Sequence, residues 1–326
     1  MTQRHTEMTA WLDDRFHEYR LAPVSDDASF RRYYRVIPGD GGPSRILMDA
    51  PPDKEDVRPF AAIAARLRQV GVQAPRVHAS DEARGFLLLD DFGDCRYLDA
   101  LDETTVERLY GDALGALSVM QACVSADELP LYDEPLLRAE IALFPDWLLQ
   151  RHLGLTLDAD ETRLIAEAAD TLVVNALAQP QVFVHRDYHS RNLMRIGQGN
   201  PGVLDFQDAV RGPVTYDLVS LLRDCYIRWP RERVEDWAWG YFDLAVQSGI
   251  LREEHESRFQ RWFDLMGMQR QLKAAGIFAR LDQRDGKPGY LADIPRTLAY
   301  LVEVAPDYPD LAAFGEWVAR RVLPVL

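Results

Sequence analysis

The stretch VFVHRDYHSRNLMRIGQGNPGVLDF, residues 182–206, decides the fold. Three short apolar runs within it, VFVH, NLMRI and GVLDF, have the length and composition of β-strands. A polar loop separates the first two runs, and the turn GQGNPG joins the second to the third. We therefore expect a strand, a polar loop and a hairpin that ends in Asp205 and Phe206.

The polar residues of this stretch stand in an order that suits phosphoryl transfer. The loop His185 to Asn192 reads H-R-D-x-x-x-x-N, and Asp205 follows thirteen residues later. Phosphoryl transfer needs a carboxylate to accept the proton of the incoming hydroxyl and oxygen ligands to hold magnesium on the phosphates. We assign Asp187 as the base, with His185 and Asn192 in the same catalytic group, and Asn192 and Asp205 as Mg²⁺ ligands. The alternative makes Asp187 and Asn192 turn residues and His185 a core histidine.

The rest of the chain predicts an α+β fold with two lobes. Residues 21–23, 30–36, 45–49 and 85–89 form β-type runs between turn clusters, with one helix over residues 55–70. Helical spacing of apolar residues then predicts helices over residues 105–123, 134–152, 161–177, 214–227, 233–247, 253–281 and 294–304. We expect a small antiparallel N-lobe over residues 1–93, a larger helical C-lobe over residues 94–326, and ligands in the cleft between them.

Composition excludes several classes of function. The 326 residues carry a formal net charge of -15 without a dense Lys/Arg block, so nucleic acid is not expected as a partner. No run of 18 apolar residues and no secretory leader is visible, which predicts a cytoplasmic protein without membrane contact. The three cysteines lack metal-site spacing. No obligatory protein partner is evident.

The stretch around His185 resembles the aminoglycoside phosphotransferase and choline kinase superfamily, which has a protein-kinase-like fold. A second signature, LDFQDAVRGPVTYDL over residues 204–218, looks like the segment that follows the metal aspartate in that superfamily. The resemblance implies that the chain uses ATP and Mg²⁺. It also implies that Asp217 braces the catalytic loop through hydrogen bonds, whereas the alternative is an acid at a helix N-terminus.

Four further strings resemble one subfamily, the bacterial N-acetylmuramate/N-acetylglucosamine anomeric kinases of cell-wall recycling. They are SDDASFRRYYRV, ILMDAPPDKED, GFLLLDDFGD and GIFARLDQRDGKPGYLADIP. This resemblance implies phosphorylation of the anomeric (C1) hydroxyl of a small amino sugar. A hemiacetal hydroxyl is more acidic than an ordinary alcohol, so a single carboxylate can serve as its base.

The nucleotide site departs from the wider kinase pattern. No G-x-G-x-x-G stands between the first two strands, so Ser25 and Ser29 are expected to contact phosphate there with backbone N–H groups. Met48 stands where the ATP-binding lysine is expected, and Arg31, Arg32 or Lys54 could supply the missing charge. The family fold implies that the backbone of the segment Leu89, Asp90, Asp91 and Phe92 binds adenine.

The acceptor residues are expected on the helix over residues 253–281 and its extension. Positions 270, 273, 277, 280 and 284 share one helix face if the helix continues through Gly276. The candidate acceptor-binding residues are His189, Gln269, Arg270, Lys273 and Arg280. That face could bind the lactyl carboxylate of N-acetylmuramate; the alternative is a face exposed to water. Phe144 and Trp147 could form an apolar wall for a sugar, or pack in the core.

Two other functions remain open from the sequence. The same reaction could use an aminoglycoside, choline or another amino alcohol as acceptor, although cationic acceptors favour acidic or aromatic pockets. A nucleotide-binding regulator without activity would explain the missing lysine and glycine-rich loop, but it would not need a general base.

Overall fold

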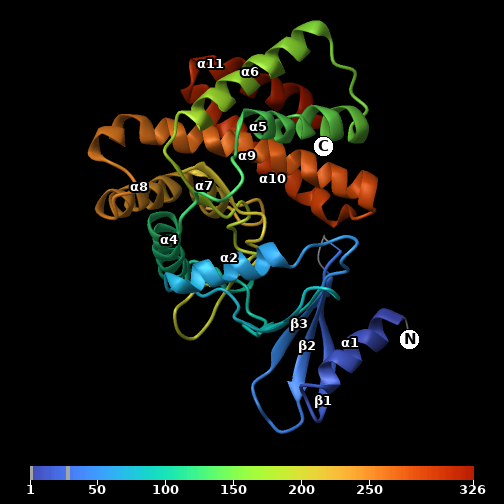
Figure 1. Ribbon diagram of the computed structural model, residues 1–326. Coiled ribbons are helices and arrows are strands. Elements are labelled where there is room, and N and C mark those ends of the chain that lie inside the picture. The colour runs from blue at the N-terminus through green and yellow to red at the C-terminus, as the bar shows by residue number, and fades with distance from the viewer. Residues whose placement is uncertain (1–2, 27–29) are drawn as a thin grey trace. The chain divides into compact units, whose positions relative to one another are not determined.

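The computed structural model describes residues 3–26 and 30–326, which divide into two compact units (Figure 1). Unit 1 contains Met1–Ala100 and Leu193–Asp208, and unit 2 contains Leu101–Asn192 and Ala209–Leu326. These units differ from the sequence ranges 1–93 and 94–326 chiefly in the hairpin after the catalytic loop, which packs in unit 1. The assignment of nucleotide binding to residues 1–93 and of catalysis to residues 94–326 stays a prediction.

Unit 1 is built on a five-stranded antiparallel sheet with the order β1-β2-β3-β5-β4. Its strands are β1 (Tyr19–Asp26), β2 (Arg32–Pro38), β3 (Arg45–Asp49), β4 (Val77–Asp81) and β5 (Phe86–Asp90). The sequence did not predict β4, because this edge strand, VHASD, alternates between half-buried and exposed positions and has few apolar residues. Met48 lies in β3 opposite Tyr33 and is buried.

The described residues of unit 1 form three helices. They are α1 (Gln3–Asp13), α2 (Arg58–Gln69) and α3 (Tyr97–Ala100). Helix α1, which the sequence analysis did not predict, buries Met8, Trp11 and Leu12 in a core cluster with side chains from β2, β3 and β5. Helix α2 confirms the helix expected over residues 55–70, and Gly71 follows it with a φ of 89° that favours glycine.

The hairpin of β7 (Leu193–Met194) and β8 (Gly202–Val203) confirms the predicted pair of runs after the catalytic loop. It joins unit 1 through backbone hydrogen bonds, since Val203 N–H donates to the Gln73 carbonyl at 2.7 Å and Arg195 N–H donates to the Cys95 carbonyl at 2.8 Å. A Cβ on Gly202 would lie 2.7 Å from the Phe92 ring, so only glycine allows this approach. These contacts explain why the hairpin packs with unit 1.

Unit 2 is mainly helical around α9 (Glu256–Asp285), a helix of 30 residues that contacts α5, α6, α7, α8 and α10 (Figure 1). The other α-helices are α4 (Val106–Cys123), α5 (Glu134–Ile141), α6 (Ala159–Leu177), α7 (Tyr216–Leu222), α8 (Arg231–Gln247), α10 (Ile294–Val304) and α11 (Pro309–Trp317). The short helical segments are η1 (Phe144–His152), η2 (Glu253–His255), η3 (Pro288–Asp293), η4 (Ala305–Asp307), η5 (Val318–Val322) and η6 (Leu323–Val325).

The helix predicted over residues 134–152 is divided into α5 and η1, and α11 was not predicted. Strand β6 (Gln181–Val184), which leads into the catalytic loop, pairs with β9 (Val210–Pro213). Over residues 3–26 and 30–326, each helix is too short or too polar to cross a bilayer.

Candidate active site

The catalytic loop over residues 185–192 begins where β6 ends, and Asp217 of α7 braces its first residues. Asp217 is fully buried and accepts hydrogen bonds from the backbone N–H groups of His185 at 2.6 Å and Arg186 at 3.0 Å. Arg186 has a φ of 79°, an uncommon conformation for a residue with a side chain. Two N–H donors from consecutive residues hold this turn in place, which confirms the expected bracing role of Asp217.

Hydrogen bonds within the loop fix its polar side chains. The backbone N–H of Asp187 donates to Nδ1 of His185 at 3.2 Å, and Nδ2 of Asn192 donates to the Asp187 carbonyl at 3.0 Å. His185 is fully buried, so in this geometry it positions the loop. Asn192 uses its amide nitrogen within the loop, and its Oδ1 is the atom of the type that Mg²⁺ binds.

A second buried carboxylate, Asp224, braces the middle of the loop and was missed by the sequence analysis. Its Oδ2 accepts from Ser190 N–H and its Oδ1 from Tyr226 N–H, both at 2.9 Å. The only available signal was an acid near the end of the helix predicted over residues 214–227, and its partner is 34 residues away in sequence. Its loop contact could only be identified in the folded chain.

Burial and neighbouring basic side chains act in opposite directions on the pKa of the Asp187 carboxyl group. Burial raises its pKa, but Lys273, His189, Arg270 and His185 lower it by more, and the net pKa lies below the usual value. An ionised carboxylate at neutral pH is the state that accepts a proton. Lys273 and Arg270 come from α9, so the predicted acceptor helix does carry cations toward the predicted base.

The predicted acceptor face of α9 divides into a buried and an exposed part. Gln269, Arg270 and Lys273 have only 0%, 6% and 7% of their surface exposed, which argues against a solvated face at these positions. Arg280 is half-buried, and Arg284 pairs with the neighbouring Asp285 in solvent. Helix α9 continues through Gly276, the condition on which the shared face depended.

The buried polar groups of this face differ in their partners. The ammonium of Lys273 lies 2.8 Å from the Tyr216 hydroxyl and 3.2 Å from Glu140 Oε1, and Gln269 Nε2 donates to the Tyr132 hydroxyl at 3.2 Å. Within the part of the chain that the structure describes, no hydrogen-bond partner is found for Nε of Arg270 or for Nδ1 of His189. Burial also lowers the pKa of His189, which favours the neutral imidazole.

Phe144 and Trp147 do not form a common wall. Phe144 is fully buried and packs against Phe314 with ring centroids 6.5 Å apart. The guanidinium of Arg151 lies over the Trp147 ring at 4.0 Å. The core-packing alternative therefore describes Phe144, which is out of reach of a sugar.

Asp205 lies in unit 1, at the end of the hairpin, with a φ of 62°. Its Oδ1 accepts from Gln207 Nε2 at 2.9 Å and lies 3.7 Å from a guanidinium nitrogen of Arg31. Arg31 is buried, whereas Arg32 is exposed and the Lys54 side chain is half exposed. Of the three cations considered for the missing lysine, Arg31 is the one in an ion pair with Asp205.

The carboxylate of Asp205 and the amide oxygen of Asn192 are the donor types that Mg²⁺ prefers.

The predicted adenine segment uses its carboxylates internally. Asp90 pairs with His78 at 2.7 Å and accepts from Arg76 N–H at 3.0 Å, while Asp91 accepts from Arg35 Nε and Ser44 Oγ at 2.6 Å. Only backbone groups of this segment are left for a base edge. Leu89 is buried in β5, where it pairs with Ile46.

The two predicted phosphate-contacting serines are only partly covered by the structure. Ser25 pairs with Tyr33 in the register of β1 and β2. Ser29 lies outside the described residues. The phosphate contacts of both serines remain predictions.

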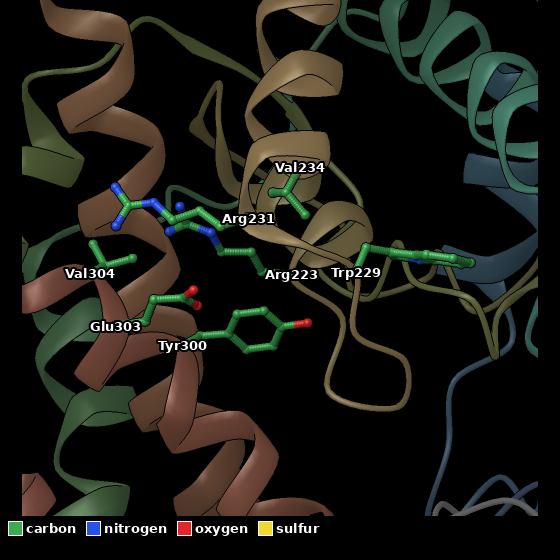
Figure 2. A pocket seen from close by; sticks show the side chains of 7 residues that line it. All are labelled: Arg223, Trp229, Arg231, Val234, Tyr300, Glu303 and Val304. Atoms are coloured by element: carbon green, nitrogen blue, oxygen red, sulfur yellow. The ribbon is translucent and has the colours of Figure 1, made fainter. Parts of the chain in front are cut away.

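A small cavity in unit 2 lies among residues that none of the site predictions includes (Figure 2). Its lining residues are Arg223, Trp229, Arg231, Val234, Tyr300, Glu303 and Val304. The charged groups have partners, since Arg223 pairs with Asp264, Arg231 with Glu235 and Asp307, and Glu303 with Arg228. This cavity is a packing feature held by ion pairs.

The chain is similar to known proteins over most of its length. The model of the phosphotransferase enzyme family matches residues 20–256. The chain is 46% identical over 328 residues to an N-acetylmuramate/N-acetylglucosamine kinase of Pseudomonas aeruginosa, covering 97% of this chain and 96% of that protein. It is 45% identical over 329 residues, with the same shares covered, to the protein of that name from Pseudomonas putida.

A solved structure shows the fold. A thermostable mutant of an aminoglycoside phosphotransferase, in a ternary complex with ADP and hygromycin B, is similar with a TM-score of 0.59 and 15% identity. The match covers 89% of this chain and 96% of that chain. The predicted α+β, protein-kinase-like fold is thereby confirmed.

Proposed function

The chain belongs to the phosphotransferase enzyme family, and from this membership we propose that it transfers the γ-phosphoryl group of ATP to the anomeric hydroxyl of N-acetylmuramate, N-acetylglucosamine or both. The relatives from two Pseudomonas species bear the name of that activity at 45–46% identity. The observation that carries the proposal is the braced loop over residues 185–192, with Asp187 half-buried and held ionised beside cations of α9. The anomeric sugar phosphate that this reaction would form belongs to cell-wall recycling.

In this proposal Asp187 accepts the proton of the sugar hydroxyl. The oxygen of that hydroxyl bonds to the γ-phosphorus, and the bond between the γ-phosphorus and the departing ADP oxygen breaks. Because neighbouring charges lower its pKa, Asp187 is a weak base, and the acidic hemiacetal hydroxyl compensates for that. Asn192 and Asp205 would hold Mg²⁺, which neutralises phosphate charge when bound. Arg31, through its ion pair with Asp205, would take the place of the missing strand lysine. The backbone from Leu89 to Phe92 would bind adenine.

Arg270 is the cation best suited to the acceptor. It is buried, its Nε has no partner in residues 3–26 and 30–326, and its charge acts on Asp187. A buried guanidinium of this kind suits the lactyl carboxylate of N-acetylmuramate. His189, with its unpartnered Nδ1, would bind a sugar hydroxyl. Positive charge beside the base disfavours cationic acceptors such as choline or an aminoglycoside.

A panel of acceptors tests the substrate. With ATP and Mg²⁺ we expect turnover of N-acetylmuramate or N-acetylglucosamine and none of kanamycin or choline. Turnover of neither sugar would refute the assignment. The proposal includes no nucleic acid, membrane or obligatory protein partner, and a cytoplasmic location remains a prediction.

Asp187→Asn tests the base within the same panel. We expect it to lower kcat by about 100-fold or more, because Asn cannot accept the proton. Asp208→Asn is the control, since Asp208 is an exposed acid and bears no role in the proposal. Full activity in Asp187→Asn, with folding unchanged, would remove Asp187 from its role.

A further inference from the structure

Glu140 of α5 is a buried carboxylate to which the sequence analysis gave no role. Its side chain is 8% exposed, and its Oε1 contacts a guanidinium nitrogen of Arg186 and lies 3.2 Å from the ammonium of Lys273. Its Oε2 accepts a hydrogen bond from the Tyr132 hydroxyl. One carboxylate is thus shared by a cation of the catalytic loop and a cation of α9.

The cluster around Glu140 is closed on the side of α9. The ammonium of Lys273 also meets the Tyr216 hydroxyl at 2.8 Å, and the rings of Tyr132 and Tyr216 lie edge to face with centroids 5.2 Å apart. Tyr132 and Tyr216 are 1% and 0% exposed. In such surroundings an ammonium without its counter-ion is strongly unfavourable, so Lys273 must pair with an available carboxylate.

Two carboxylates compete for Lys273. The ammonium of Lys273 lies 3.2 Å from Glu140 Oε1, and its positive charge also lowers the pKa of Asp187. Arg186 connects the carboxylates of Glu140 and Asp187. Its side chain pairs with Glu140, and its backbone N–H, bound by Asp217, directly precedes Asp187 in the chain. A base must keep an oxygen accessible to the incoming hydroxyl, and an ammonium paired to it directly would block that oxygen.

We propose that Glu140 is a positioning residue of the phosphoryl transfer: it holds Lys273 beside Asp187 and prevents Lys273 from pairing with the base. This inference rests on the proposed function. When the Glu140 charge is lost, the ammonium of Lys273 pairs with Asp187. The variant protein stays folded and binds nucleotide, but its Asp187 no longer accepts the proton. Glutamine at position 140 keeps an oxygen that Arg186 and Lys273 can both contact, so the substitution removes the negative charge and keeps the shape of the side chain.

Glu140→Gln, compared with Glu134→Gln, tests the proposal. Glu134 begins the same helix, and its exposed side chain pairs with Arg138. We expect kcat of Glu140→Gln to fall by about tenfold or more, with the KM for ATP within about twofold of wild type. Glu134→Gln should stay within about twofold in both constants. A kcat of Glu140→Gln within about twofold of wild type would overturn the proposal.

A second substitution separates positioning from a general loss of structure. In the double variant Glu140→Gln, Lys273→Met no ammonium is left to block Asp187, so kcat should recover by about fivefold or more over Glu140→Gln. If Glu140 had only a structural role, kcat would not recover in the double variant, and a kcat that does not recover would refute the inference. If Glu140→Gln does not fold, the double variant is compared with Lys273→Met, where equal kcat supports the proposal and a kcat lower by about tenfold overturns it.

Failure of the proposed function is distinguishable, because the wild type is measured in the same assay. A wild type without turnover counts against the kinase assignment. The pairing of Glu140 with Lys273 is then tested by urea unfolding of the wild type, Glu140→Gln, Lys273→Met and the double variant. We expect the two substitutions to be coupled by about tenfold or more in the unfolding equilibrium constant, and additive effects would refute the shared pairing.

Discussion

At the scale of single residues, the catalytic loop depends on buried acids that accept backbone hydrogen bonds. Asp217 and Asp224 together bind four N–H groups, of His185, Arg186, Ser190 and Tyr226. A loop that carries a residue at positive φ needs such anchors, because that conformation costs free energy. The acids therefore keep Asp187 in one orientation before any substrate binds.

Asp217 should make stability depend on pH. Burial raises its pKa to about 7 and outweighs the lowering by the N–H groups of His185 and Arg186, whereas an unfolded aspartate titrates near 3.8. The native state then binds a proton more readily than the unfolded state. The free energy of unfolding should therefore fall as pH rises from about 4 to about 7, by up to about 1.4 kcal/mol per unit.

Urea unfolding of the wild type and of Asp217→Asn across that pH range measures this effect. The asparagine variant lacks the titrating group, so the difference between the two free energies should change with pH in the stated direction. Parallel curves would show that Asp217 keeps an ordinary pKa in the folded protein.

Arg31 and Arg32 offer a matched pair for the nucleotide site. Arg31 is buried beside Asp205, and Arg32 is exposed. Arg31→Met should raise the KM for ATP by about tenfold or more, since one charge-assisted contact contributes roughly 1.5–3 kcal/mol. Arg32→Met should leave it within about twofold. A larger rise in the KM for ATP in Arg32→Met than in Arg31→Met would assign the phosphate contact to Arg32.

At the scale of elements, α9 is held by a close approach that only glycine permits. A Cβ on Gly276 would lie 2.4 Å from the backbone carbon of Leu143, next to η1. Gly240 of α8 is exposed, and apart from the neighbouring residues of its own helix backbone a Cβ there would meet no atom within 4 Å. The two glycines occupy helices of the same unit and differ in what surrounds them.

Replacing each glycine by alanine should therefore act in opposite directions. Gly276→Ala should lower the free energy of unfolding by about 1–3 kcal/mol, because the backbone of residue 143 cannot move aside freely. Gly240→Ala should raise it by about 0.5–1 kcal/mol, because alanine favours the helix more than glycine does. Urea denaturation of both variants checks the pair, and equal effects would contradict the packing described for α9.

The elements that the sequence predicted well include those with strong apolar periodicity, such as α2 and α10. Those it missed have weaker or shorter signals. Helix α1 places Met8, Trp11 and Leu12 at helical spacing, but the charged N-terminal segment around them hides this pattern. Strand β4 is an edge strand whose neighbour supplies most of its apolar contacts, so its own sequence contains little β signal.

At the scale of the whole molecule, the residues proposed for one reaction belong to two compact units. Asp187 and Asn192 lie in unit 2, and Asp205 lies in unit 1 with the hairpin. The sequence predicted these residues because the loop and the hairpin have a fixed order. It could not predict the packing of the hairpin, which depends on Phe92, Gln73 and Cys95, or the contact of Glu140 with Lys273, which joins residues 133 positions apart.

The phosphorus NMR spectrum of the product tests the central claim most directly. After incubation of the protein with ATP, Mg²⁺ and N-acetylmuramate or N-acetylglucosamine, we predict a phosphate signal split by the single anomeric proton and absent with Asp187→Asn. A signal split by the two protons of a primary alcohol, or release of inorganic phosphate alone, would contradict the assignment of this chain as an anomeric sugar kinase.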